Sequence, residues 1–414
     1  MKTLKSTIFA ALGLLLTIAA IAEKPESTWF YMNSRGSSYK TNFVLASNLM
    51  VLPFRINETD SLNFIFDTGM SRTIITDLSN PQVVLLSQGR KVRVKGLGPN
   101  ESVEGILSRN NALSLGKIYG KSQEILVIPN NTIDLSSGMG HQINGIIGRS
   151  IFERFVVEIS YINKTVQFFD PERFNRKIRS NEEVIPIELI DGRPYINAQV
   201  TINGNVVPVK LLFDTGMSFA LWLDQSTDLN LKPAALSRSD VFGQGLNGAV
   251  TGEISRVEKF QIGKFEFSNV IAAFPHSDVI HNATTSNDRN GSVGADIFRR
   301  FNVTIDYRNS RIILRKNSSF KEPFTYDMSG VEVGSVIPGL PYYRIVSVGK
   351  NTPAAECGLE ENDEIKSING QLAKNLSLFE ITSLLRRKEG RKIKITVKRN
   401  GEIVKVKFRL RKLV

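Results

Sequence analysis

The feature that most constrains this chain is a five-residue string that occurs twice. Its copies are Asp67-Thr68-Gly69-Met70-Ser71 and Asp214-Thr215-Gly216-Met217-Ser218, which lie 147 residues apart. Each copy follows an apolar run that ends in Phe, so the sequence predicts that each Asp stands where a buried strand breaks into a turn. Other landmarks keep nearly the same offset, namely Gly96 with Gly243, Gly105 with Gly252, Gly148 with Gly294 and Phe155 with Phe301. The chain therefore contains an internal duplication.

Two aspartates brought together by such a duplication have a definite chemistry. A single solvated carboxylate has a pKa of about 4 and is a weak general base at neutral pH. Two carboxyl groups in contact cannot both ionise, so the pair holds one proton and titrates in two separated steps. One Asp can then take a proton from water while the other gives a proton to a substrate carbonyl. This hydrolyses a peptide bond without a metal or a covalent intermediate. The Gly of each motif allows close backbone approach, and the Thr hydroxyl can bond across to the facing loop.

These motifs resemble those of the aspartic peptidases, in particular a retropepsin-like unit repeated within one chain. In both halves a Gly-rich stretch begins 29 residues after the Asp, where the family carries the flap that closes over substrate. The family's closing strand, helix and final strand are similar to residues 146–161 and again to residues 292–307, where Ser292 takes an apolar position. The resemblance covers residues 43–316 and implies an intramolecular pseudo-dimer, so a monomer can assemble the Asp pair.

The resemblance assigns roles to residues of both halves. Asp67 and Asp214 are the expected catalytic pair. The residues expected to support the catalytic loops are Thr68, Gly69, Ser71, Thr215, Gly216 and Ser218. The residues expected in the flaps and against substrate are Gly96, Leu97, Gly98, Gly243, Gly245 and Leu246. No metal or cofactor is expected.

Competing motifs carry less weight. Residues 243–248 formally match the GxGxxG dinucleotide fingerprint, but no helical pattern follows, so a hairpin is favoured. His276, Asp278 and His281 lie in a polar stretch without a helix to align them as metal ligands. The string GxSxG is absent, which leaves a serine-type triad with weak support. The string HExxH is also absent.

Residues 1–22 have the pattern of a secretory signal. Lys2 and Lys5 precede an apolar run from Ile8 to Ile21, and small residues end the run at Ala22. We expect cleavage after Ala22 and a periplasmic or secreted protein without a stable membrane span, with an uncleaved anchor as the alternative. The chain has one Cys, Cys357, which excludes an internal disulfide.

The C-terminal part resembles a bacterial PDZ domain. The resemblance rests on the runs 338–345, 352–355 and 358–370 and on the helical spacing of apolar residues at 376–387. It implies that an extended peptide ligand adds to a sheet edge. The peptide-binding residues that it assigns are Gly339, Leu340, Tyr342, Tyr343 and Arg344. Pro341 removes one backbone amide from this loop, so recognition of a C-terminal carboxylate stays open.

The formal charge of +13 is concentrated near the C-terminus. Residues 386–412 contain thirteen Lys or Arg and only two Glu. The basic residues alternate with apolar ones around Asn400-Gly401, which predicts a β-hairpin with a solvated basic face. No aromatic residues interleave on that face, so nucleic-acid binding is not expected.

The sequence thus predicts a mainly β protein in which tandem retropepsin-like (acid protease) β-barrel halves form a pseudo-dimer followed by an α+β PDZ domain. The expected parts are a signal peptide at 1–22, an irregular lead-in at 23–42, halves at 43–181 and 182–316, a linker at 317–330 and the PDZ domain at 331–414. The expected function is an exported aspartic endopeptidase acting on polypeptides, with the PDZ domain engaging a substrate or partner peptide. The alternative is a non-catalytic envelope protein that binds a peptide or ligand on the same fold.

Overall fold

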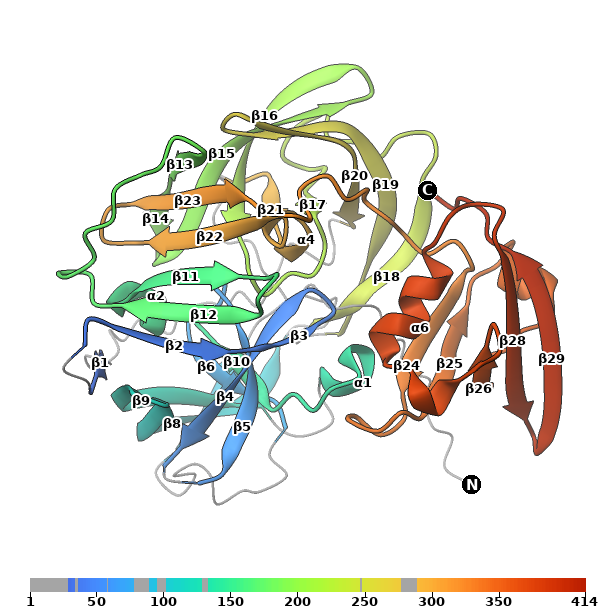
Figure 1. The fold of residues 1–414 in the computed structure, drawn as a ribbon, viewed down its shortest axis with the longest axis horizontal. Coiled ribbons are helices and arrows are strands. Elements are labelled where there is room, and N and C mark those ends of the chain that lie inside the picture. Colours follow the sequence, from blue (N-terminus) through green and yellow to red (C-terminus); the bar gives the residue numbers. More distant parts are fainter. Residues whose placement is uncertain are drawn as a thin grey trace.

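The fold is dominated by β-sheets, as expected (Figure 1). The structure is a computed structural model that describes residues 29–33, 36–57, 59–77, 89–94, 102–128, 133–245, 248–276 and 289–414. Within these ranges, no helix has the length and apolarity needed to cross a membrane. The predicted signal at 1–22 lies outside the described residues.

Six strands of the first half close into a barrel. They are β4 (Leu49–Ile56), β5 (Ser61–Phe66), β6 (Thr73–Ile75), β8 (Val103–Leu115), β9 (Ile118–Val127) and β10 (Gly145–Ile147). Pairing runs in the order β4–β5–β10–β6–β9–β8 and returns to β4. Three further strands extend the ring: β1 (Trp29–Met32) pairs with β9, β3 (Val44–Ala46) with β4 and β7 (Arg90–Val94) with β8.

The second half repeats this ring strand for strand. Its six strands are β15 (Arg193–Ile202), β16 (Asn205–Phe213), β17 (Leu221–Leu223), β19 (Gly248–Ile262), β20 (Phe265–Pro275) and β21 (Gly291–Val293). Pairing runs β15–β16–β21–β17–β20–β19 and returns to β15. Here β14 (Glu188–Ile190) extends β15, and β18 (Arg238–Gly245) extends β19. The duplication read from the sequence is therefore a duplication of structure.

A shared sheet joins the two barrels. Its order is β13 (Glu182–Pro186), β23 (Arg311–Lys316), β22 (Phe301–Asp306), β11 (Val156–Ser160), β12 (Thr165–Phe169) and β2 (Ser38–Asn42). The central pair, β11 and β22, comes from the two halves and runs antiparallel. The short helices α2 (Ser150–Arg154) and α4 (Ala295–Phe298) lead into these two strands. The expected irregular lead-in is wrong for residues 29–42, because β1 and β2 find partners far along the chain.

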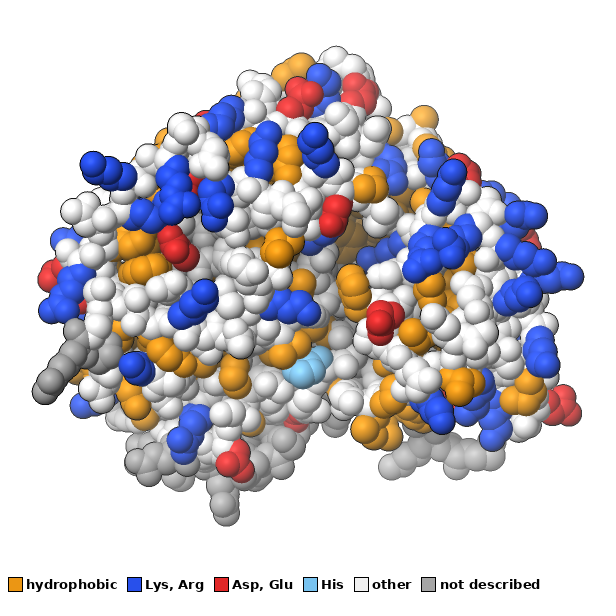
Figure 2. Space-filling view, in the orientation of Figure 1, with side chains coloured by type: hydrophobic (Ala, Val, Ile, Leu, Met, Phe, Trp, Pro, Cys, Tyr) orange, Lys and Arg blue, Asp and Glu red, His pale blue; other side chains and the backbone are white. Residues whose placement is uncertain are grey.

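The C-terminal domain has its own sheet and its own apolar core. The sheet order is β24 (Val331–Ser335), β25 (Tyr343–Val348), β26 (Glu364–Ile368), β28 (Lys392–Arg399) and β29 (Glu402–Arg409), with β27 (Gln371–Leu372) on β26. Its helices are α5 (Pro353–Glu356), the 3₁₀ turn η3 (Ala373–Asn375) and α6 (Leu378–Leu385), which begins with a Ser377–Glu380 capping box. Asn400 and Gly401 have φ of +48° and +93° between β28 and β29, which confirms the predicted hairpin turn. Figure 2 shows Lys and Arg side chains gathered over this domain.

The C-terminal domain contacts both barrels. The Gly339 N–H donates to the Gly140 carbonyl, 3.4 Å away, just after the first-half helix α1 (Ser136–Met139). In the second half, Nε of Arg256 of β19 donates to the Val414 carbonyl at 3.3 Å. The linker adds a bond from the Tyr326 hydroxyl to the Asp240 carboxylate of β18. The domain therefore bridges the two barrels.

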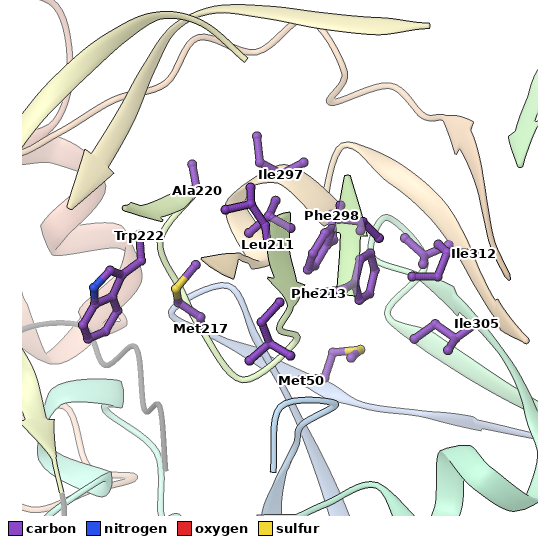
Figure 3. Packing of buried hydrophobic residues seen from close by; sticks show 14 of the residues in the cluster. Met50, Leu211, Phe213, Met217, Ala220, Trp222, Ile297, Phe298, Ile305 and Ile312 are labelled. Atoms are coloured by element: carbon purple, nitrogen blue, oxygen red, sulfur yellow. The ribbon is translucent and has the colours of Figure 1, made fainter. Parts of the chain in front are cut away.

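Stacked aromatic rings support the strands that precede the two Asp motifs. Phe213 of β16 stacks on Phe298 of α4 with ring centroids 3.8 Å apart, as Figure 3 shows. Phe66 of β5 stacks on Phe152 of α2 at 4.2 Å in the first half. Met50 of β4 joins the same apolar cluster as the second-half residues. The cluster therefore continues from one barrel into the other beneath both motifs.

We predict that Phe298→Ala destabilises the second barrel. The ring is fully buried, so truncation leaves a cavity, and we expect the free energy of unfolding to fall by about 3–5 kcal/mol. Urea denaturation followed by tryptophan fluorescence checks this, because Trp222 is buried in the same cluster. Phe379→Ala on α6 is the matched control, since that ring is 64% exposed and its loss should change stability by no more than about 0.5 kcal/mol. Equal effects of the two substitutions would contradict this account of the core.

Candidate active site

Asp67 and Asp214 lie at equivalent points of the two barrels. Each follows the last residue of a strand, β5 or β16, that pairs in parallel with the closing strand of its barrel. The Asp67 N–H donates to the Ile147 carbonyl and the Asp214 N–H to the Val293 carbonyl, both at 3.0 Å. These bonds fix where each turn begins, and both carboxyl groups are buried, with residue exposures of 1% and 0%.

The two Thr residues of the motifs hold the catalytic loops together. The Thr68 hydroxyl donates to the Phe213 carbonyl at 2.5 Å and accepts the Thr215 N–H at 3.1 Å. The Thr215 hydroxyl donates to the Phe66 carbonyl at 2.8 Å and accepts the Thr68 N–H at 3.1 Å. The expected bonding across to the facing loop is therefore present in both directions.

The Gly residues of the motifs let each carboxyl group reach the opposite loop. A Cβ at Gly216 would lie 2.3 Å from the Asp67 carboxyl carbon, and a Cβ at Gly69 would lie 3.1 Å from that of Asp214. Any larger residue at Gly216 would push the Asp67 side chain away. Each Gly N–H also donates to Oδ1 of the Asp two residues earlier, at 2.6 Å for Gly69 and 2.9 Å for Gly216.

Each carboxyl group lies against the opposite loop, and both Oδ2 atoms are buried without a hydrogen-bond partner among the described residues. The two carboxyl groups act on each other's pKa. Burial raises the pKa of Asp67 well above its usual range, and the negative charge of Asp214 raises that pKa further. Burial raises the pKa of Asp214 to about 6, a rise limited by hydrogen bonds from Asp67 and Gly216 and by the positive charges of Arg289 and Arg193. At neutral pH the pair therefore holds one proton.

The other residues assigned to the catalytic loops have more ordinary surroundings. Ser71 is partly exposed, whereas Ser218 is buried. The Ser218 carbonyl accepts a hydrogen bond from the Asn48 side chain at 3.2 Å. Asn48 lies in the turn between β3 and β4 of the first half, and the sequence did not single it out. Arg193 and Arg289 were also missed.

Only part of the expected flap residues can be placed. Gly96, Leu97, Gly98 and Leu246 lie outside the described residues. Gly243 and Gly245 lie in β18, where Gly243 has a φ of +149° at a register shift and Gly245 pairs with Gly248 of β19. Residues 243–245 and 248 therefore lie in paired strands, whereas a dinucleotide fingerprint requires that a helix begin there.

The residues assigned to peptide binding in the C-terminal domain lie around the β24–β25 turn. Gly339, Leu340 and Tyr342 lie in the turn, and Tyr343 and Arg344 begin β25. β25 is flanked by β24 and β26, whereas β24 pairs only with β25 among the described strands. A peptide strand can therefore add beside β24, next to α6, but not beside β25, and this topology does not support the sequence-based choice of residues.

The alternatives weighed from the sequence gain no structural support. His276 is described, but Asp278 and His281 lie outside the described residues. Within the described ranges, no group of three or more His, Cys, Asp or Glu side chains is arranged to hold a metal. Cys357 is a free, half-buried thiol.

We predict that removing either Thr hydroxyl loosens the contact between the catalytic loops. Thr68→Val and Thr215→Val each remove one donor and one acceptor from buried bonds, so each should cost about 1–3 kcal/mol of unfolding free energy. Thr76→Val is the matched control, because the Thr76 hydroxyl is also buried but has no hydrogen-bond partner within the described part of the chain. Urea unfolding of the three variants measures this. A loss for Thr76→Val as large as for the other two would contradict the role given to the hydroxyls.

We also predict that Asp67→Asn stabilises the protein, and more so as pH rises. Because both Asp pKa values are raised by folding, the folded state binds more protons than the unfolded state above about pH 4, and stability falls as pH rises through that window. The variant lacks one of these groups, so its melting temperature should exceed that of the wild type at pH 7.5, by about 2–4 °C for each kcal/mol regained. The excess should shrink toward pH 4. Thermal melts at both pH values check this, with the exposed Asp60→Asn as control. A difference that does not depend on pH would contradict the raised pKa values.

Comparison with known proteins agrees with this geometry. A family model described as aspartyl protease matches residues 52–151 and again residues 198–296. A PDZ domain model matches residues 328–410. No curated protein matches the chain. The two barrels are thus a tandem pair of retropepsin-like aspartyl-protease regions, and the chain belongs among aspartyl-protease-like proteins that carry a C-terminal PDZ domain.

Proposed function

We propose that this protein is an aspartic endopeptidase that cuts polypeptides by activating a water between Asp67 and Asp214. One observation carries the proposal: two buried carboxyl groups, one from each half, lie at the contact of the two loops, each against the Gly of the opposite motif. A purely structural turn has no need to bury two acidic groups against each other, because such burial costs stability. Enzymes keep such costly arrangements where the charge serves a reaction.

In this mechanism the two carboxyl groups take different parts. The positive charges of Arg289 and Arg193 favour the ionised form of Asp214. The ionised member of the pair accepts a proton from the water as the water oxygen bonds to the substrate carbonyl carbon, and the protonated member gives its proton to the carbonyl oxygen. As the tetrahedral diol collapses, the C–N bond breaks, the leaving nitrogen takes a proton from the pair, and one diol hydroxyl returns a proton to the pair.

The Thr bonds and the Gly contacts support this chemistry by preorganisation. The two Thr side chains tie the loops across the pseudo-dimer, and each Gly N–H holds one Asp oxygen. The carboxyl groups therefore need no rearrangement before the proton transfers, which lowers the cost of reaching the transition state.

A PDZ domain implies peptide binding, and we propose that this one takes an extended peptide along the open edge of β24. The first-half helix α1 lies close to that edge, because a Cβ at Gly334 of β24 would lie 3.9 Å from the Ser137 carbonyl oxygen. A peptide that paired along all of β24 would therefore meet α1.

We further propose, from the pattern of residues 1–22 alone, that the protein is exported.

The test is cleavage of an unfolded polypeptide by the full chain. We expect Asp67→Asn and Asp214→Asn each to lower kcat/KM by several orders of magnitude, because each removes a group that acts on the reacting atoms. Asp60→Asn, an exposed residue in the turn between β4 and β5, should cleave as well as the wild type. Activity should fall below about pH 6, where the pair takes up its second proton, and again as pH rises far enough for the pair to lose its remaining proton. Equal activity in all variants, or peptide binding without turnover at any pH, would overturn the proposal and favour a binding protein.

A further inference from the structure

Four positions differ in kind between the two otherwise equivalent barrels; in the second barrel three of their side chains are buried and that of Arg193 is partly exposed. In the second barrel they hold Arg193, Tyr195, Arg289 and Ser292, which we name the second-half polar cluster. In the first barrel the corresponding positions hold Leu49, Val51, Ile143 and Ile146, all of which are buried in one apolar cluster. The change is therefore from four apolar side chains to four polar ones.

The strand register establishes the correspondence. Ile65 and Leu212 each lie two residues before a catalytic Asp. Val51 of β4 pairs with Ile65, and Tyr195 of β15 pairs with Leu212. Ile146 of β10 and Ser292 of β21 pair with the same two residues from the other side. Leu49 and Arg193 lie two residues before Val51 and Tyr195, and Ile143 and Arg289 lie two residues before the first residues of β10 and β21.

The cluster adjoins Asp214. Residues that pair directly across a sheet share a face, so Tyr195, Leu212 and Ser292 lie side by side on one face of the barrel. Strands β15 and β16 are antiparallel, and Tyr195 pairs with Leu212. Arg193, two residues before Tyr195, therefore lies across from Asp214, two residues after Leu212, on the same face. The charges of Arg193 and Arg289 act on the Asp214 carboxylate, and Arg289 also interacts with the Tyr195 hydroxyl.

The cluster holds buried hydrogen-bond donors without acceptors. Nε of Arg193, Nη1 of Arg289 and Oγ of Ser292 are buried and have no hydrogen-bond partner among the described residues. Arg289 as a whole is only 7% exposed. Each such group costs about 1–3 kcal/mol, and more when charged, unless an acceptor fills the space. The guanidinium nitrogens can only donate, so the missing partner is an acceptor.

The charges point to an anion. Two guanidinium groups bring two positive charges beside the catalytic pair, and that pair carries one negative charge when it holds a single proton. Among the described residues, one positive charge is therefore left without a counter-charge. Arg guanidinium groups match the planar geometry of a carboxylate with two parallel hydrogen bonds.

We propose that the second-half polar cluster is a carboxylate-binding subsite that selects substrates with an acidic group next to the bond to be cut. The proposal rests on the peptidase function proposed above and adds the substrate class. The acidic group is either a Glu or Asp side chain or the free carboxylate at the end of a polypeptide.

The experiment uses the full chain and families of short, unstructured peptides. One family places Glu or Gln at each position around a single cleavable bond, and a second ends in a free carboxylate or an amide close to that bond. We expect the wild type to prefer the charged member of one family by at least about 10-fold in kcat/KM, the range of a hydrogen bond to a charged group. Preference in the first family identifies an internal acidic residue, and preference in the second identifies the chain end.

The variants replace cluster residues by the residues of the first barrel. Arg289→Ile and Arg193→Leu should bring the ratio of charged to neutral substrate close to one, while Arg289→Lys, which keeps the charge, should retain part of the preference. Arg308→Met is the control, because Arg308 lies in the β22–β23 turn with its side chain 55% exposed, and it should keep the wild-type ratio. Thermal melts identify any variant that fails to fold, and Arg289→Lys then carries the comparison.

A binding arm separates this inference from the peptidase function. In the Asp67→Asn variant, peptide affinity is measured by fluorescence anisotropy with the same peptides. Tighter binding of the charged peptide there, lost when Arg289→Ile is added, supports the subsite even if no peptide is cleaved. Cleavage with no charge preference in the wild type, or a preference that survives both Arg289→Ile and Arg193→Leu, overturns it and leaves the peptidase function standing.

Discussion

The structure depends on the contact between two identical loops, each of which completes the other. Thr68 bonds to the backbone on both sides of Asp214, and Thr215 does the same around Asp67. The same contact forces the carboxyl groups together, because each packs against the Gly of the opposite motif. One set of short, buried bonds thus links the two barrels and buries both carboxyl groups, and this burial is the main cause of both raised pKa values. The contact between the two loops therefore both stabilises the pseudo-dimer and sets the protonation of the Asp pair.

The two barrels share one strand order, whereas their interiors near the Asp pair differ. Both rings pair their strands in the same order, and both place a stacked Phe pair beneath the Asp motif. Yet one lining is apolar and the other is rich in hydrogen-bond donors. A dimer of two identical chains could not hold such a difference, because every substitution would appear on both sides. Fusion of the halves into one chain removes that constraint, so the two Asp residues can have unequal pKa values and unequal neighbours.

The sequence predicted the features that depend on neighbouring residues or on the duplicated motif. Helix α2 lies within residues 146–161, where the resemblance implied a helix between two strands, and Asn400-Gly401 has the turn geometry that its residue types favour. The Asp pair and the Thr contacts followed from the duplicated motif.

Strand pairing over long distances did not follow, since nothing in residues 29–42 indicates partners in β9 and β12. The polar cluster was missed because the hairpin from Tyr195 to its partner Leu212 is three residues longer than that from Val51 to Ile65, so a constant offset pairs the wrong residues of β4 and β15. Ser292 in an apolar position was its one visible sign.

The central claim is that Asp67 and Asp214 share one proton at neutral pH. Neutron diffraction from deuterium-exchanged crystals of the full chain measures this most directly, because it locates the deuterium atom itself. The account predicts a single deuterium between the two Oδ2 atoms, with the Gly69 and Gly216 amides still bound to the Oδ1 atoms. Two carboxylates that carry no deuterium, or that stand apart with solvent between them, would contradict it.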